Sequence, residues 1–254
     1  MSSQQAPQQG PTLAPPGATQ PADLSPEMYA RLPIVFHKMM KMEMRKNFGC
    51  ATLIFMGWRQ TSGLGAATIG TFFFQGGVMM IIGSVLEWVL GNSFFAVVFA
   101  TYGGFWLSYA ATLNPSFAAF SSYAGPTAHS PAEGLATPGF LSSLAFWLLF
   151  MGLITFIFFL CSMFMSFVFM ILFLSLCITF LLLTGALFAL ANDPVGNARV
   201  GSRCIVGAGS SLFVTSMSGW YVFTSILFSV LGLPIKLPLL EFSCGRRSKE
   251  EVEV

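Results

Sequence analysis

Glu87 is the only acidic residue inside the long apolar segments of this 254-residue chain, and it has the clearest capacity for chemistry. A charged side chain at the centre of a membrane costs about 2.5–3.5 kcal/mol on insertion scales, and less near the headgroups. Trp88 follows directly and Gly91 closes the segment, which predicts a position at headgroup level. Two interpretations stay open: an interfacial carboxylate that hydrogen-bonds Asn92 or nearby backbone, or a carboxylate that accepts protons at the cytoplasmic mouth of a pathway.

Hydroxyl groups and aromatic rings recur together in the next apolar segment, Ser93–Leu113. Tyr102, Phe105, Ser108 and Tyr109 have helical spacing and are expected on one face. Such a face suits a narrow pore for a small, weakly acidic solute, and it equally suits helix–helix packing. The sequence shows no Ser/His/Asp set, metal-ligand cluster or phosphate-binding loop. We therefore predict that the protein is not an enzyme and uses no metal or cofactor.

The composition is typical of membrane proteins. Hydrophobic residues make up 55% of the chain and charged residues 9%, and some long stretches carry no charge. We therefore expect membrane lipids around these stretches. The formal net charge of +2 gives no reason to expect a nucleic-acid partner.

The two ends of the chain are polar. Residues 1–33 are dominated by Gln, Pro, Ala and Ser, which predicts a disordered cytosolic N-terminal tail. Residues 34–46 mix basic residues with Met, and form either an interfacial amphipathic helix or a basic flank that fixes topology. Pro234 and Pro238 are expected to end helical structure, so residues 233–254 are predicted to be a cytosolic C-terminal tail.

The intervening residues 47–232 are predicted to form six transmembrane helices, because about 20 apolar residues are needed to cross the hydrocarbon core. The expected spans are Phe48–Gly63, Leu64–Leu90, Ser93–Leu113, two helices within Gly139–Ala191 that break near Cys161–Met163, and Ile205–Leu231. Asn114–Pro138 and Asn192–Arg203 are expected to be loops. The predicted fold class is an all-α membrane protein.

The basic residues predict the orientation. With six spans, nine Lys and Arg residues lie on the side of the two termini and three lie on the other side. The positive-inside rule then places both termini in the cytoplasm of a multi-pass protein, which we expect in the plasma membrane.

Small residues recur every seven positions in the second expected span, at Gly70, Gly77, Ser84 and Gly91. Seven residues are close to two helical turns, so these positions are expected to form one stripe. Small residues let helix backbones approach closely in lipid. The stripe favours packing between helices or subunits over the lining of a pore.

One stretch resembles the acetate uptake transporter family, which moves acetate, related small monocarboxylates or succinate in fungi, bacteria and archaea. The resemblance is carried by Gly76-Gly77, Gly83, Glu87, Gly91-Asn92-Ser93-Phe94 and Tyr102-Gly103-Gly104-Phe105-Trp106-Leu107-Ser108. It implies six helices per subunit, assembled as a hexamer with one pathway in each subunit. It also implies a narrow constriction, to which Phe55 and Tyr102 are matched.

This chain departs from the family in one signature. The family has Asn-Pro-Ala-Pro-Leu-Gly-Leu, whereas this chain has Asn47-Phe48-Gly49-Cys50-Ala51-Thr52-Leu53 and therefore lacks both prolines. The predicted solute path consists of Asn47, Thr52, Phe55, Glu87, Asn92, Tyr102, Phe105 and Ser108. The predicted function is transport of acetate or a related small carboxylate, coupled to protons or channel-like. The alternatives are export of ammonia or ammonium, and a non-transporting membrane assembly or sensor protein.

Overall fold

The regular structure is helical in the part of the chain that the computed structural model describes, namely residues 63–231, 233–235, 237 and 238. Within this part, five helical segments are long and apolar enough to cross a membrane. The predicted all-α membrane fold is therefore confirmed. The expected span Phe48–Gly63 lies outside the described residues except for Gly63, and so do Asn47, Thr52 and Phe55.

The first described span changes helix type along its length. It begins with η2 (Gly63–Thr68) and the single turn α2 (Ile69–Thr71), passes through the π-helical segment η3 (Phe72–Val78), and ends as α3 (Met79–Val89). A π-helix bonds residue i to residue i+5 and therefore has more residues per turn than an α-helix. Residues seven apart no longer lie two α-helical turns apart across this segment.

The π segment explains why the predicted stripe of small residues is not continuous. Gly77 is buried, and a Cβ atom there would overlap the side chain of Leu107. Gly70, seven residues earlier, is exposed, and no atom of the described residues lies within 4 Å of the position that a Cβ atom would take there. Ser84 does contact the next helix, because its hydroxyl donates to the carbonyl of Ala96 at 2.7 Å. Gly91 forms the turn instead, with a φ of +78° that favours glycine.

The helix after this turn, α4 (Ser93–Leu113), has the predicted bounds. Residues 114–137 connect it to the next helix and contain three short 3₁₀ helices, η4 (Pro115–Phe117), η5 (Ser121–Tyr123) and η6 (Pro131–Ala136). The expected loop is therefore a folded segment, which we call the α4–α5 cap.

Three long helices complete the described chain: α5 (Pro138–Ser162), α6 (Phe167–Asn192) and α7 (Ala198–Val230). The break within Gly139–Ala191 is confirmed, and it lies between Ser162 and Phe167. The loop expected at Asn192–Arg203 is wrong in its second half, because α7 already begins at Ala198. Arg199 and Arg203 are exposed and one helical turn apart, so the helix carries both charges on its surface.

Hydroxyl groups join α6 and α7. The Ser175 and Thr215 hydroxyl oxygens lie 2.8 Å apart, and the Ser211 hydroxyl donates to the Ser175 carbonyl at 2.7 Å. Two hydroxyl groups of α7 bond to the chain that follows the helix. The Ser225 hydroxyl donates to the Leu237 carbonyl at 3.0 Å, and the Tyr221 hydroxyl donates to the Pro238 carbonyl at 2.8 Å. The chain therefore folds back along α7 at the start of the expected C-terminal tail.

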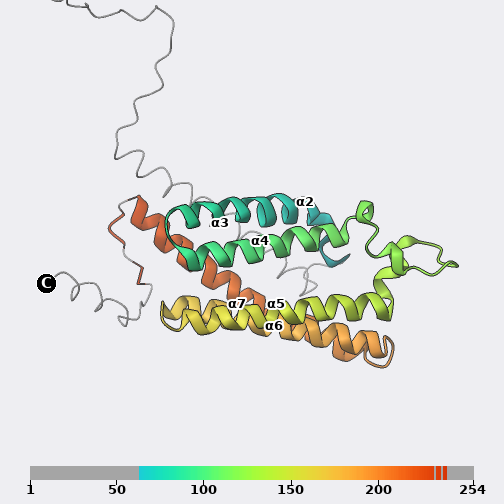
Figure 1. Ribbon diagram of the computed structural model, residues 1–254. Helices are drawn as coiled ribbons and strands as arrows, with labels where there is room; N and C mark the ends of the chain where they lie inside the picture. Colours follow the sequence, from blue (N-terminus) through green and yellow to red (C-terminus); the bar gives the residue numbers. More distant parts are fainter. Residues whose placement is uncertain (1–62, 232, 236, 239–254) are drawn as a thin grey trace, which may run out of the picture.

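The helices form two sets that meet through aromatic rings. The α3–α4 pair lies beside the α5–α6 pair, and α7 crosses obliquely from the latter towards the former (Figure 1). The ring of Phe94 is centred 6.0 Å from that of Phe158 on α5, and the ring of Phe105 is 5.4 Å from that of Phe180 on α6. Tyr102 also contacts Phe158, at 6.0 Å.

The two glycines of the first span provide a matched test of this packing. Gly77→Val should destabilise the α3–α4 pair by about 1–3 kcal/mol, because the new side chain must displace Leu107. Gly70→Val should leave stability unchanged, because no part of the described chain lies where the new side chain would extend. The measurement is the thermal unfolding midpoint of the purified protein in detergent. Equal midpoints for the two variants would contradict the packing described.

Candidate functional site

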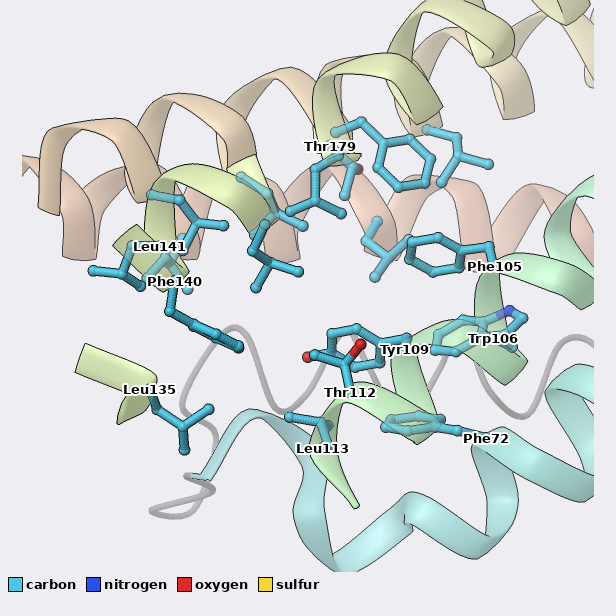
Figure 2. Close-up of a pocket in the computed structure, with 18 residues that line it drawn as sticks. Phe72, Phe105, Trp106, Tyr109, Thr112, Leu113, Leu135, Phe140, Leu141 and Thr179 are labelled. Atoms are coloured by element: carbon cyan, nitrogen blue, oxygen red, sulfur yellow. The ribbon is translucent and has the colours of Figure 1, made fainter. Parts of the chain in front are cut away.

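A cavity lies where the two helix sets meet, between α4, α5, α6 and α7, with Leu135 of the cap at its edge (Figure 2). Its volume is about 90 Å³, measured as the space open to the centre of a water molecule. Most of its lining is leucine and aromatic side chains. Tyr109, Thr112 and Thr179 supply the hydroxyl groups, and no charged residue is among the described residues that line it.

The cavity has two distinct ends. Figure 2 shows Leu135 and Phe140 at one end, and Phe72, Phe105 and Trp106 at the other. The first end is built by the cap and the beginning of α5, whereas the second is built by the π segment and the middle of α4.

Aromatic stacking fixes the shape of the second end. Phe72 stacks on Trp106 with ring centroids 4.9 Å apart, and Phe105 stacks on Trp147 of α5 at the same distance. Phe72 and Trp106 are almost completely buried, at 1% and 4% exposure. Because these rings are held on several sides, this end of the cavity is a preformed wall.

Two of the cavity hydroxyls already donate their protons. The Thr112 hydroxyl donates to the Ser108 carbonyl at 2.9 Å, and the Thr179 hydroxyl donates to the Ser175 carbonyl at 2.9 Å. A threonine hydroxyl has one proton and two lone pairs. Both oxygens can therefore still accept a hydrogen bond from a molecule in the cavity, whereas their protons are committed to the helix backbone.

Tyr102 lies one helical turn from Phe105 and Trp106, beyond the aromatic end of the cavity. Its hydroxyl is 2.9 Å from the Thr155 hydroxyl of α5, and both residues are buried. Thr155 donates its proton to the Met151 carbonyl at 2.7 Å. Tyr102 must therefore be the donor of the bond between them, and this bond ties the two helix sets together.

Glu87 and Asn92 lie at the α3–α4 turn, away from the cavity lining. The Asn92 amide donates to a Glu87 carboxylate oxygen at 2.7 Å, and Glu87 has no exposed surface. The Asn92 backbone N–H also donates to the Glu87 carbonyl at 2.9 Å. The structure contains the hydrogen bond of the first interpretation, between Glu87 and Asn92, and this bond closes the turn around Gly91. Proton acceptance by Glu87 stays a prediction.

The described residues of the predicted path thus do not lie in one place. Phe105 lines the cavity, and Tyr102 lies just beyond it. Glu87 and Asn92 form the turn, and Ser108 is exposed and not part of the lining. Tyr109 lines the cavity as part of the expected face of α4. The solute roles of all these residues stay predictions.

Several lining residues were not expected from the sequence. Phe72, Leu135 and Phe140 come from three different elements. The Phe-Phe-Phe run at residues 72–74 was a usable signal for an aromatic wall. Nothing local marked Leu135, because its role depends on how the cap folds onto α5.

The bond between Tyr102 and Thr155 predicts an asymmetric response to substitution. Thr155→Val leaves a buried tyrosine hydroxyl without its acceptor and should cost about 1–3 kcal/mol, whereas Tyr102→Phe should cost about 1 kcal/mol. The double variant should cost less than the sum of the two. Thermal unfolding of the three variants measures this, and strict additivity would contradict the bond.

Comparison with known proteins identifies the family and the fold. The sequence pattern of the GPR1/FUN34/yaaH family matches residues 48–243. "Protein alcS" of Aspergillus fumigatus is 39% identical over 188 residues, which are 74% of this chain and 68% of that protein. "Acetate permease A" of Emericella nidulans is 31% identical over 153 residues, covering 60% of this chain and 48% of that protein.

A solved structure gives an independent view of the fold. The bacterial acetate channel SatP superposes with a TM-score of 0.61 at 22% sequence identity, over 80% of this chain and 97% of that chain. This likeness concerns the helix arrangement. Together with the five apolar helices, the match over residues 48–243 shows that the chain is a multi-pass membrane protein that belongs to the GPR1/FUN34/yaaH family.

Proposed function

We propose that this protein carries acetate or a similar small carboxylic acid across the membrane, and that the cavity between the helix sets is part of the route. Relatives named as an acetate permease and an acetate transporter protein support the solute class, as does the acetate channel with the same fold. The site supports a solute route because the cavity lies where the two helix sets meet and ends next to Tyr102.

The observation that carries the proposal further is the chemistry of the lining. A carboxylate has about four lone-pair sites to satisfy, and it needs donors or cations when it leaves water. The described lining has no charged residue, and Thr112 and Thr179 offer only acceptor oxygens. The other polar groups of the described lining are the Tyr109 hydroxyl and the Trp106 indole N–H, and two neutral donors fall short of what a carboxylate requires.

This lining suits the uncharged, protonated acid. The acid O–H can donate to a threonine oxygen, and its alkyl part can contact the aromatic and leucine side chains. Transport of the protonated acid moves a proton with each acid molecule, which fits the expected coupling to protons. The proposed path therefore includes Tyr102 and Phe105, with Thr112 and Thr179 as the acceptors.

Ammonia export is the second candidate, because an uncharged lining with acceptor oxygens also suits a neutral molecule that donates N–H bonds. "Ammonia transport outward protein 2" of Saccharomyces cerevisiae is 31% identical over 153 residues, covering 60% of this chain and 47% of that protein. Flux measurements with each solute on the same purified protein separate the two candidates. A protein that only assembles or senses would pass neither.

The wider arrangement is part of the same proposal. We infer a subunit of six spans with cytoplasmic termini in the plasma membrane, and a protein that is not an enzyme. We also propose self-association as a hexamer, which the family resemblance implies. Large apolar side chains that α5 and α6 expose, such as Phe150 and Leu181, can contact lipid or another subunit. Lipid contacts the part of this surface that other subunits leave uncovered.

Filling the cavity should block transport. Thr112→Phe places a ring in the cavity and should reduce acetate flux into proteoliposomes to that of protein-free vesicles. Thr101→Phe is the matched control, because Thr101 is on the same helix with an equivalent bond to the Val97 carbonyl and does not line the cavity. Full flux through the Thr112→Phe variant would exclude the cavity from the route.

The pH dependence tests the charge state of the solute. At constant total acetate, protein-dependent flux should fall roughly tenfold for each pH unit above the pKa of the acid itself, following its protonated fraction. Flux into proteoliposomes is measured over a pH series, with protein-free vesicles subtracted. Flux that follows the acetate anion instead would contradict transport of the protonated acid while leaving acetate transport intact.

A further inference from the structure

The α4–α5 cap is a fixed structure on the end of the cavity. Gly134 in η6 is buried, and a Cβ atom there would overlap the carbonyl of Phe120. Glycine is therefore required for the two segments of the cap to approach this closely. Phe120 itself is buried at 7% exposure, so the cap has an apolar centre of its own.

Hydrogen bonds hold the beginning and the end of η6. The Glu133 carboxylate accepts from the Ser130 backbone N–H at 3.2 Å and from the His129 N–H at 3.0 Å, and the Ser130 hydroxyl accepts from Ala132 at 3.3 Å. This is a capping box, which fixes a helix start. At the other end, the Thr137 hydroxyl donates to the Gly134 carbonyl at 2.8 Å.

Tyr123 attaches the cap to α5. Its ring packs edge-on against Phe140 with centroids 5.6 Å apart, and its hydroxyl lies 3.4 Å from that of Ser143. Gly139 leaves the room for this ring, since a Cβ atom there would lie 3.3 Å from it. Phe140 lines the cavity, so the cap and the cavity end are one packed unit.

The folded α4–α5 cap places the Leu135 side chain at the cavity. Leu135 lines the cavity together with Phe140 and lies at its end (Figure 2). It is only partly buried, and Ala136 next to it is exposed, so in the described part of the protein it lies between the cavity and the surface. Gly134 and Thr137 on either side keep the backbone of η6 in place.

We propose that Leu135 sets the upper size limit of the solute at this end of the route, with Phe140 as the opposing wall. The inference rests on the proposed function, because it assigns a selectivity residue to the same cavity. A branched acid must pass the Leu135 side chain, whereas acetic acid has a single methyl group to accommodate. Since the cap is held at both ends, the side chain and not a movement of the loop determines the opening.

The experiment compares two acids that share a carboxyl group and differ in bulk, acetate and 2,2-dimethylpropanoate, in proteoliposomes of the full chain. Leu135→Ala should raise the flux ratio of the bulky acid to acetate by roughly tenfold, because removal of the isobutyl group opens the end. Leu135→Trp should lower the ratio. Phe117→Ala is the control, because Phe117 is in the same cap but is 62% exposed and does not line the cavity.

The ratio of the two fluxes distinguishes a change in selectivity from a loss of folded protein. A variant that only destabilises the protein lowers both fluxes together and leaves the ratio unchanged. An unchanged ratio in Leu135→Ala and in the milder Leu135→Val, with acetate flux preserved, would overturn the role of Leu135 and leave the proposed function standing. Absence of protein-dependent flux of either acid in the unaltered protein would overturn both.

Discussion

The space between two sets of helices is filled by aromatic rings, and the rest of the described structure depends on this. Helices within a set pack through small residues and hydroxyl groups, as at Gly77, Ser84 and Ser175. Between the sets, the contacts come from side chains as large as Phe94 and Phe105. Rings reach further than aliphatic side chains, so the backbones stand apart and a cavity remains where the rings do not meet.

The hydrogen bond from the Tyr102 hydroxyl to the Thr155 hydroxyl fixes the position of one helix set relative to the other. Rings alone can slide over one another at small cost, whereas a buried hydroxyl pair has one satisfied geometry. The proton of Thr155 goes to its own helix, and the proton of Tyr102 goes across to the other set. The same pattern recurs at Thr112 and Thr179, whose protons stay with their own helices. Polar side chains inside this bundle therefore present oxygen lone pairs more than protons.

Much of the fold could be predicted from the sequence, because local signals mark it. Helix α4 begins and ends as expected, since Gly91 permits the left-handed turn before it and Pro115 lies two positions after its last residue, Leu113. The start of α7 was misplaced because hydropathy treats Arg199 and Arg203 as loop residues, although a helix can expose both. Small residues do recur every seven positions in the sequence. The π segment changes the number of residues per turn, so these residues do not form one stripe in the structure.

The site was less predictable than the fold. Phe105 and Tyr109 were found because they share a helical face. Leu135 could not be found, since it reaches the cavity only through the folding of the cap. The bond between Glu87 and Asn92 was predictable because five residues and a glycine turn separate the two.

The π segment Phe72–Val78 has a consequence for how sequences of this family should be compared. Such a segment accommodates one residue more than an α-helix that covers the same rise, so it is the natural place for a single-residue insertion or deletion. Because the extra residue is taken up within the segment, removing one residue there would convert it to regular α-helix while α2 and α3 keep nearly the same orientation relative to each other. The same deletion within a regular α-helix such as α4 would turn everything before it by about 100°. A one-residue gap in the π segment is therefore a local change beside the aromatic wall, whereas a one-residue gap in α4 would rotate part of that wall away from the cavity.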